Sequence, residues 1–143
     1  MIRLADIGVL IALADRNHFQ HAPARFWLRS NPRVALATCT LTEMGFLRVY
    51  GHPSYPGGPG STKRALEDLQ AYRQRKGHCF LPCDLPFDDT VFTDLGGLTS
   101  KEINELYLVA LAAHHGIRFA TFNASVPLDR IRHGTNAIEV IPA

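Results

Sequence analysis

The sequence has no long apolar run and few cysteines. None of its apolar stretches approaches the roughly 18 residues that a membrane span needs. The apolar start of the chain is interrupted by Asp6 and ends at Asp15 without a small-residue cleavage site, so we expect no signal peptide. The cysteines, Cys39, Cys79 and Cys83, are odd in number and lack the spacing of a disulfide framework. We therefore expect a cytoplasmic protein without a membrane segment.

Other familiar sites are also missing. Cys79 and Cys83 could chelate a metal, but no second Cys/His pair lies at zinc-knuckle spacing, so we interpret both as small buried hydrophobic residues. The glycine-rich stretch within residues 51–60 lacks the preceding strand and the following Gly-Lys-Ser/Thr of a phosphate-binding loop. No convincing order of serine, histidine and aspartate indicates a serine hydrolase. These absences argue against zinc-knuckle, nucleotide-binding and serine-hydrolase functions.

What the sequence does contain is typical of a single folded domain. It has 143 residues, of which 46% are hydrophobic and 20% charged, and this size can bury a core without disulfides. No linker or repeat divides residues 1–143. The formal net charge of +2 is compatible with a polyanionic partner but does not establish one.

Short apolar runs alternate with longer helical patterns along the chain. The runs that indicate strands are residues 2–4, 33–37, 79–81, 117–121 and 138–141. The segments that indicate helices are residues 8–14, 18–29, 40–49, 61–76, 87–95 and 99–115, with a helical turn at 127–132. Residues 51–60 contain too many prolines and glycines for either structure. The alternation predicts an α/β fold, with a mostly parallel sheet of four to five strands flanked by helices on both faces.

Four polar residues follow strands or begin helices in this scheme. Asp6 follows the first strand, Glu43 and Glu105 lie early in helices, and Asn123 follows the fourth strand. In parallel sheets, ligands bind beyond the carboxyl ends of the strands. Clustered carboxylates repel one another unless a cation neutralises them, and oxygen ligands suit Mg²⁺ or Mn²⁺. The pattern is therefore consistent with metal-assisted hydrolysis of a phosphodiester.

Each acid also has a purely structural interpretation. Thr40 and Glu43 have the spacing of a capping box, as do Thr99 and Glu102. Asp6 could cap the helix that follows it, and Glu105 could be a solvated helix residue. Spacing alone leaves both interpretations open.

Three longer segments carry a family resemblance. LADIGVLIALADRNHFQHAPARFW, LATCTLTEMGFLRV and INELYLVALAAHHGIRFATFN occur in this order and resemble three blocks of PIN-domain toxins of the VapC type. The resemblance extends over nearly the whole chain. It implies one PIN domain over residues 1–143 and an Mg²⁺- or Mn²⁺-dependent endoribonuclease that inhibits translation. It also implies a homodimer, and a VapB-like antitoxin whose C-terminal segment inserts a basic side chain among the acids.

The resemblance assigns roles residue by residue. By matching position, Asp6, Glu43 and Glu105 are the expected metal ligands, and Glu105 stands where the family usually has aspartate. Gly8 replaces the usual asparagine, and Asn123 replaces a fourth acid. An amide lacks the charge of a carboxylate, so these departures support an alternative: an impaired PIN-like module that binds RNA or antitoxin without cleaving.

Several basic residues and histidines complete the candidates. Arg48, Lys63 and Arg64 could contact RNA phosphates, although the basic run that includes Lys63 and Arg64 could equally be a solvated helix face. We interpret His18 and His21 as packing or surface residues, and assign no chemistry to His114 and His115 at the end of a helix. A receiver-like phosphorylation module would need a lysine after the fourth strand, which the sequence lacks.

Overall fold

The computed structural model describes residues 1–143 and has one five-stranded sheet with the strand order β3-β2-β1-β4-β5. In chain order the elements are β1 (Ile2–Ala5), α1 (Ile7–Ala14), α2 (His21–Ser30), β2 (Ala35–Cys39), α3 (Thr40–Tyr50), α4 (Thr62–Arg73), β3 (Cys79–Leu81), α5 (Ser100–His114), β4 (Arg118–Thr121), a 3₁₀ turn (Leu128–Arg130) and β5 (Ile138–Val140). Every neighbouring pair of strands is parallel. The predicted α/β class is confirmed.

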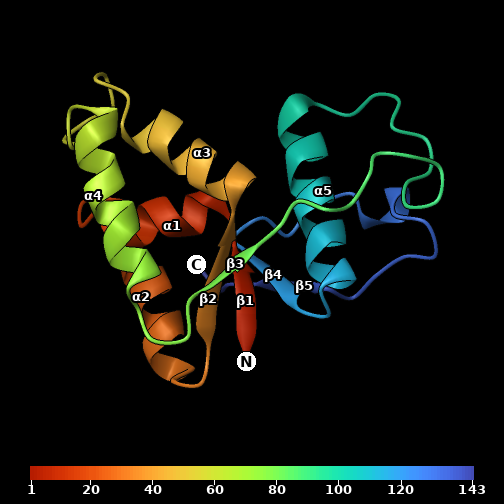
Figure 1. The fold of residues 1–143 in the computed structure, drawn as a ribbon, viewed down its shortest axis with the longest axis horizontal. Helices are drawn as coiled ribbons and strands as arrows, with labels where there is room; N and C mark the ends of the chain where they lie inside the picture. Colours follow the sequence, from red (N-terminus) through yellow and green to blue (C-terminus); the bar gives the residue numbers. More distant parts are fainter.

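The sheet separates two helical layers, as Figure 1 shows: α1 to α4 lie on one side and α5 lies on the other. Each layer has its own buried cluster. One cluster lies between the sheet and the helices of the first layer, and it includes Phe46 and Leu69. The other cluster lies between the sheet and α5, and it includes Leu108 and Phe119. Burial of these apolar side chains is the main force that holds both layers on the sheet.

Local sequence explains the two most buried helices. Helix α1 is apolar on almost all sides, and residues 9–13 are therefore all buried. Helix α5 begins at the predicted capping box: the Thr99 hydroxyl accepts from the Glu102 amide at 3.1 Å, and the Glu102 carboxylate accepts from the Thr99 amide at 3.0 Å. This reciprocal cap fixes where α5 starts, and therefore which of its side chains meet the sheet.

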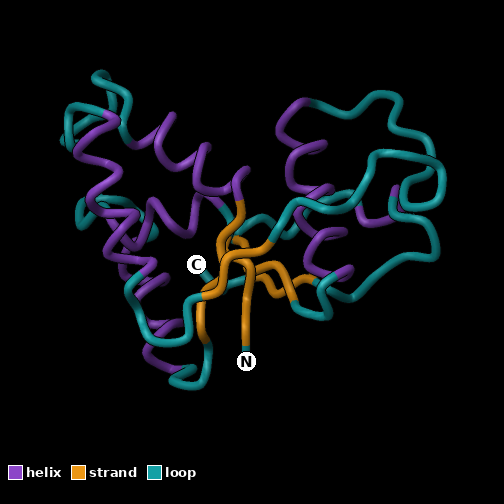
Figure 2. The backbone as a smooth tube through the Cα atoms, in the orientation of Figure 1, coloured by secondary structure: helices purple, strands orange, loops and turns teal.

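The prediction of a helix over residues 87–95 was wrong. Residues 82–99 form one long loop, which is visible between β3 and α5 in Figure 2. Its one strand-like pairing is an isolated antiparallel bridge between Phe92 and Ile131. The side chain of Asp88 accepts a hydrogen bond from the Thr90 amide at 3.0 Å, a local turn that competes with helix formation. Phe92 is buried against the α5 layer, so tertiary packing determines the course of this loop.

Smaller differences concern helix ends and a cysteine. Helix α2 begins at His21 rather than at residue 18, because the Gln20 amide donates to the His18 ring instead of entering a helix. Cys83 is exposed, so its interpretation as a buried hydrophobic residue was wrong, whereas Cys39 is fully buried. All three thiols are free. None of the helices is both long and apolar enough to traverse a bilayer.

The sheet order places a crevice beside its central strand. β1 pairs with β2 on one edge and with β4 on the other, although β4 comes more than a hundred residues later in the chain. The connections that leave β1 and β4 diverge at their carboxyl ends, and such a switch point is where parallel sheets bind ligands. Asp6 follows β1 at this point, and Asn123 lies two residues after β4.

Candidate metal centre

A cleft of about 870 Å³ opens at the switch point. Three of the four polar residues expected from the sequence line it: Asp6, Glu105 and Asn123. They come from the β1–α1 junction, the second turn of α5 and the segment after β4. The fold therefore brings Asp6 to the same cleft as two side chains that lie far away from it in the sequence.

Asp6 is anchored to β4 by both its backbone and its side chain. Its amide donates to the carbonyl of Ala120 at 3.0 Å. The hydroxyl of Thr121 donates to Oδ2 of Asp6 at 2.6 Å. Asp6 occupies the N-cap position of α1, but its side chain makes no capping hydrogen bond there. Because the carboxylate is directed to β4 and the cleft, capping does not explain this residue.

Burial raises the pKa of Asp6 to about 6, and the negative charge of Glu105 acts in the same direction. The hydrogen bond from Thr121 opposes both effects, as does the positive charge of Lys101 to a smaller extent. A carboxyl group whose charge is disfavoured by burial and by a second carboxylate is stabilised when a cation enters. The carboxyl group of Asp6 is therefore one that a bound cation would stabilise.

Glu105 is held by two neighbours in the same cleft. Its side chain is almost fully buried, so the interpretation as a solvated helix residue was wrong. The side-chain amide of Asn123 donates to Oε2 of Glu105 at 2.5 Å, and the ammonium of Lys101 lies 3.8 Å from Oε1. The side-chain oxygen of Asn123 accepts from the Ser125 amide at 2.8 Å. The side-chain nitrogen of Asn123 therefore bonds to Glu105, and its side-chain oxygen bonds to the backbone of Ser125.

Glu43 is placed differently from the other three. It is buried in the first turn of α3 but is not among the residues that line the cleft. The guanidinium of Arg73, from α4, pairs with its carboxylate, and the hydroxyl of Thr38 donates to Oε2 at 2.6 Å. The hydrogen bond with Glu43 raises the pKa of Arg73. The role of Glu43 as a metal ligand stays a prediction.

The cap of α3 also differs from the expected Thr40–Glu43 box. Cys39 is the N-cap, and the hydroxyl of Thr42 accepts from the Cys39 amide at 3.0 Å. Thr42 therefore provides the returning hydrogen bond that Glu43 was expected to make. Because its carboxylate is not used for capping, Glu43 is free to pair with Arg73.

Position 8 opens onto the cleft. Gly8 lines it, and a Cβ atom built there would meet no other atom within 4 Å. The backbone therefore has space for the asparagine that the resemblance leads one to expect at this position. Its replacement by glycine removes a polar side chain from the cleft without a steric reason.

Of the basic residues expected to contact RNA, only Arg48 lines the cleft. Lys63 and Arg64 are exposed in the first turn of α4, away from the lining. Sequence reasoning missed several cleft residues, among them Thr121, Lys101 and Phe19. Lys101 lies one turn before Glu105, a spacing that could have indicated it. Phe19 is 84% exposed although apolar, and no periodic signal identifies such a residue in a turn.

The donors in the cleft fit a hard divalent cation. The lining contains the carboxylates of Asp6 and Glu105 but no histidine and no cysteine. Mg²⁺ and Mn²⁺ prefer oxygen ligands, whereas zinc sites in proteins usually include nitrogen or sulfur. Asp6 and Glu105 are thus the residues that would hold the ion.

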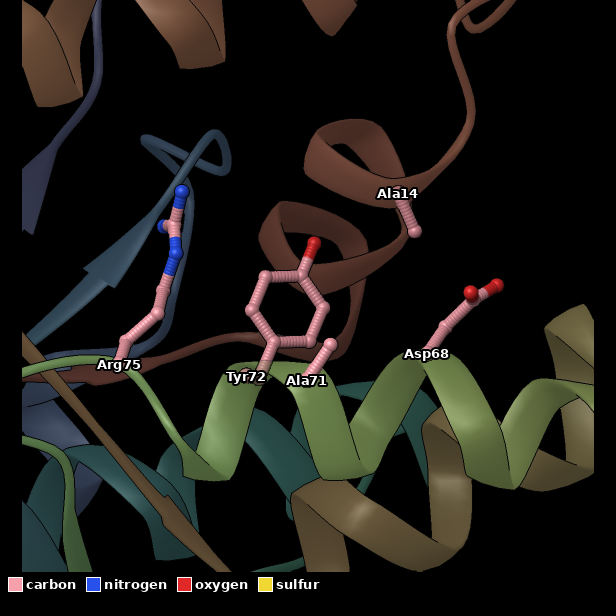
Figure 3. A pocket seen from close by; sticks show the side chains of 5 residues that line it. All are labelled: Ala14, Asp68, Ala71, Tyr72 and Arg75. Carbon is pink, nitrogen blue, oxygen red and sulfur yellow. The ribbon is translucent and has the colours of Figure 1, made fainter.

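A second hollow lies between α1 and α4 and has a different chemistry. It measures about 220 Å³ and is lined by Ala14 of α1 and by Asp68, Ala71, Tyr72 and Arg75, as Figure 3 shows. The Tyr72 hydroxyl donates to the carbonyl of Leu10 at 2.9 Å, and the Arg75 guanidinium lies 5.7 Å from the Tyr72 ring centre. The hydrogen bond from Tyr72 to Leu10 joins the two helices, and we assign the hollow to packing.

Sequence comparison gives close relatives over most of the chain. The ribonuclease VapC44 of Mycobacterium tuberculosis is 36% identical over 136 residues, which cover 94% of this chain and 95% of the relative. VapC38 from the same organism is 36% identical over 124 residues, covering 86% of each chain. VapC39 is 32% identical over 127 residues, covering 88% of this chain and 91% of the relative. No protein-family model matches the sequence.

Proposed function

Because the chain belongs to the VapC family of ribonucleases, we propose that it is an Mg²⁺- or Mn²⁺-dependent endoribonuclease that inhibits translation. One observation carries the metal dependence. Asp6 and Glu105 share a cleft at the carboxyl ends of the strands, and burial together with the charge of Glu105 raises the pKa of Asp6 to about 6. A bound divalent cation would neutralise this pair, lower the pKa of a bound water and polarise a phosphoryl oxygen.

The protein's own residues would position the reacting groups. Thr121 holds the carboxylate of Asp6 in one orientation, and Asn123 does the same for Glu105. Arg48 and Lys101 place positive charge along the cleft, which would attract the phosphates of RNA. The exposed ring of Phe19 gives the cleft a surface on which a base of single-stranded RNA could stack.

Family membership supports further parts of the proposal. The partner we propose is a VapB-like antitoxin whose C-terminal segment places a basic side chain beside Asp6 and Glu105, where it would stabilise two carboxylates that share one cleft. We also propose a homodimer located in the cytoplasm. Inhibition of translation follows if the RNA that is cut belongs to the translation machinery.

A second candidate rests on Gly8 and Asn123. An amide at position 123 and no side chain at position 8 leave two carboxylates in the cleft, which would bind a cation more weakly than a larger acidic set. Under this candidate, the protein binds RNA or its antitoxin without efficient cleavage.

The decisive experiment titrates purified protein with Mn²⁺ while cleavage of a structured RNA is followed. We expect cleavage to require the metal and to be lost in Asp6→Ala. Cleavage that persists in a chelator, or that survives Asp6→Ala, would contradict the proposal. RNA binding without cleavage at saturating Mn²⁺ would favour the second candidate.

A further inference from the structure

A second group of metal-binding side chains lies at the other end of α5. His114 is the last residue of that helix, His115 is its C-cap, and Asp84 lies in the loop after β3. One ligand atom from each of the three lies within 4.8 Å of the others. His114 is nine residues beyond Glu105, or about 13 Å along the helix axis. The group is therefore separate from the proposed nuclease centre.

Both imidazoles converge on a single oxygen. Nε2 of His115 lies 2.9 Å from Oδ1 of Asp84, and Nε2 of His114 lies 3.6 Å from the same atom. Metal–ligand bonds of about 2.0 Å in a tetrahedral zinc site place neighbouring ligand atoms about 3.3 Å apart. The two separations from Oδ1 lie on either side of that value, and the ligand atoms of all three residues lie within 4.8 Å of one another. Rotation of the two imidazoles would complete the geometry.

The surroundings favour a positive ion. The carboxyl end of a helix carries a partial negative charge, and Asp84 adds a full one. The carbonyl of Pro82 also lies 3.3 Å from Nε2 of His115. All three side chains are partly exposed, so an ion can enter without opening the core.

We propose that Asp84, His114 and His115 form a zinc site, with water in the remaining position. Two imidazoles and one carboxylate are a ligand set typical of zinc and differ from the all-oxygen donors of the cleft. The ion would tie the long loop after β3 to the end of α5. It would take the place of the hydrogen bond between Nε2 of His115 and Oδ1 of Asp84.

The test measures binding of Zn²⁺ alone to the full-length protein by isothermal titration calorimetry. It is done in the Asp6→Asn background, which leaves Glu105 as the one carboxylate lining the nuclease cleft and so weakens binding of an ion there. We expect one equivalent of Zn²⁺ to bind, and His115→Gln and Asp84→Asn each to weaken binding at least about tenfold. His52→Gln, which changes an exposed histidine elsewhere, is the matched control and should leave the affinity unchanged.

Two further measurements complete the test. One shows whether the nearby thiol of Cys83 is a ligand, and the other shows whether a variant that loses affinity is still folded. Cys83 is exposed beside Asp84, so Cys83→Ser should retain zinc binding if the histidines and the aspartate are the ligands. Thermal melting of each variant without zinc verifies that it is folded. Absence of zinc binding by the folded protein, or binding that depends on Cys83 and not on His115, would overturn the proposal. Neither result bears on Mn²⁺-dependent cleavage, because that activity is measured with Asp6 intact.

Discussion

The side-chain amide of Asn123 donates a hydrogen bond to Oε2 of Glu105, with 2.5 Å between the nitrogen and the oxygen. A carboxylate can only accept, so the nitrogen of the amide must face Glu105. The residue that replaces the expected fourth acid therefore stabilises the charge of a neighbouring acid. The contact offsets part of the charge of Glu105 and occupies one of the two oxygens that a cation could bind.

Asn123→Asp should lower the stability of the metal-free protein and raise its affinity for Mn²⁺. The new carboxylate would lie beside Glu105, and repulsion should lower the metal-free unfolding free energy by about 1–2 kcal/mol. Mn²⁺ should bind about tenfold more tightly or better, because a third carboxylate joins the cleft. Calorimetry and thermal melting with and without Mn²⁺ measure both effects. Asn136→Asp, at an exposed position outside the cleft, is the control. Equal Mn²⁺ affinity in the wild type and in Asn123→Asp would contradict the assignment.

Asp6→Asn should stabilise the metal-free protein while it abolishes cleavage. The folded-state pKa of about 6 lies above the ordinary value of 3.8, so the charged form costs stability in the folded protein. That cost is absent below about pH 4, grows as the pH rises to about 6 and is constant above it. At pH 8 we expect Asp6→Asn to gain about 1–2 kcal/mol. An amide oxygen can still accept from Thr121.

Chemical denaturation of wild type and Asp6→Asn at pH 4.5 and pH 8 measures this difference. The gain should be larger at pH 8. The exposed Asp89→Asn serves as the control and should show no such pH dependence. A gain that is equal at both pH values would show that the effect does not come from ionisation of Asp6.

Position 8 offers a test that separates helix stability from chemistry. Gly8 lies inside α1 with open space around its missing side chain. Gly8→Ala should therefore stabilise the protein by about 0.5–1 kcal/mol without changing cleavage. Gly8→Asn should raise Mn²⁺-dependent cleavage several-fold, because it restores a polar group beside the cleft. If both variants cleave RNA at the wild-type rate, position 8 has no part in the chemistry.

Arg73 should be important for stability because its partner is buried. Glu43 is 6% exposed, and removal of the guanidinium would leave its charge with Thr38 as a hydrogen-bond donor. We expect Arg73→Met to lower the unfolding free energy by about 1–3 kcal/mol. Arg29→Met, at an exposed position on α2, should change it by less than about 0.5 kcal/mol. In denaturant titrations, equal midpoints for the two variants would contradict a structural role for the pair.

Phe19 should contribute to RNA affinity if its ring stacks on a base. Stacking on an aromatic side chain contributes about 1–3 kcal/mol per base, so Phe19→Ala should weaken binding of single-stranded RNA about tenfold. Phe19→Trp should retain the affinity. Fluorescence anisotropy in the Asp6→Asn background avoids cleavage during the measurement.

Phe26→Ala is the matched control for Phe19, because Phe26 is 67% exposed but does not line the cleft. The oligomeric state of each variant should be measured by size-exclusion chromatography, so that loss of a subunit contact is not mistaken for loss of stacking. An equal loss of RNA affinity in Phe19→Ala and Phe26→Ala would rule out a specific role for Phe19.

The sequence by itself determined the order and type of nearly all elements. Apolar runs bounded by turn residues indicated all five strands, and the Thr99–Glu102 box located the start of α5. These features are local, because a strand or a cap is specified by residues close together in the chain. The loop over residues 82–99 was misjudged because its conformation depends on Phe92, which packs against residues distant in sequence.

Only the tertiary structure decided how the polar side chains are partnered. Thr121 reaches Asp6 from 115 residues away because β4 lies beside β1 in the sheet, an adjacency that no local pattern encodes. The pairing of Glu43 with Arg73, like the approach of His115 to Asp84, depends in the same way on which elements pack together. A sequence pattern identifies groups able to bind a metal, but hydrogen bonding depends on distances of about 3 Å, and the packed fold sets them.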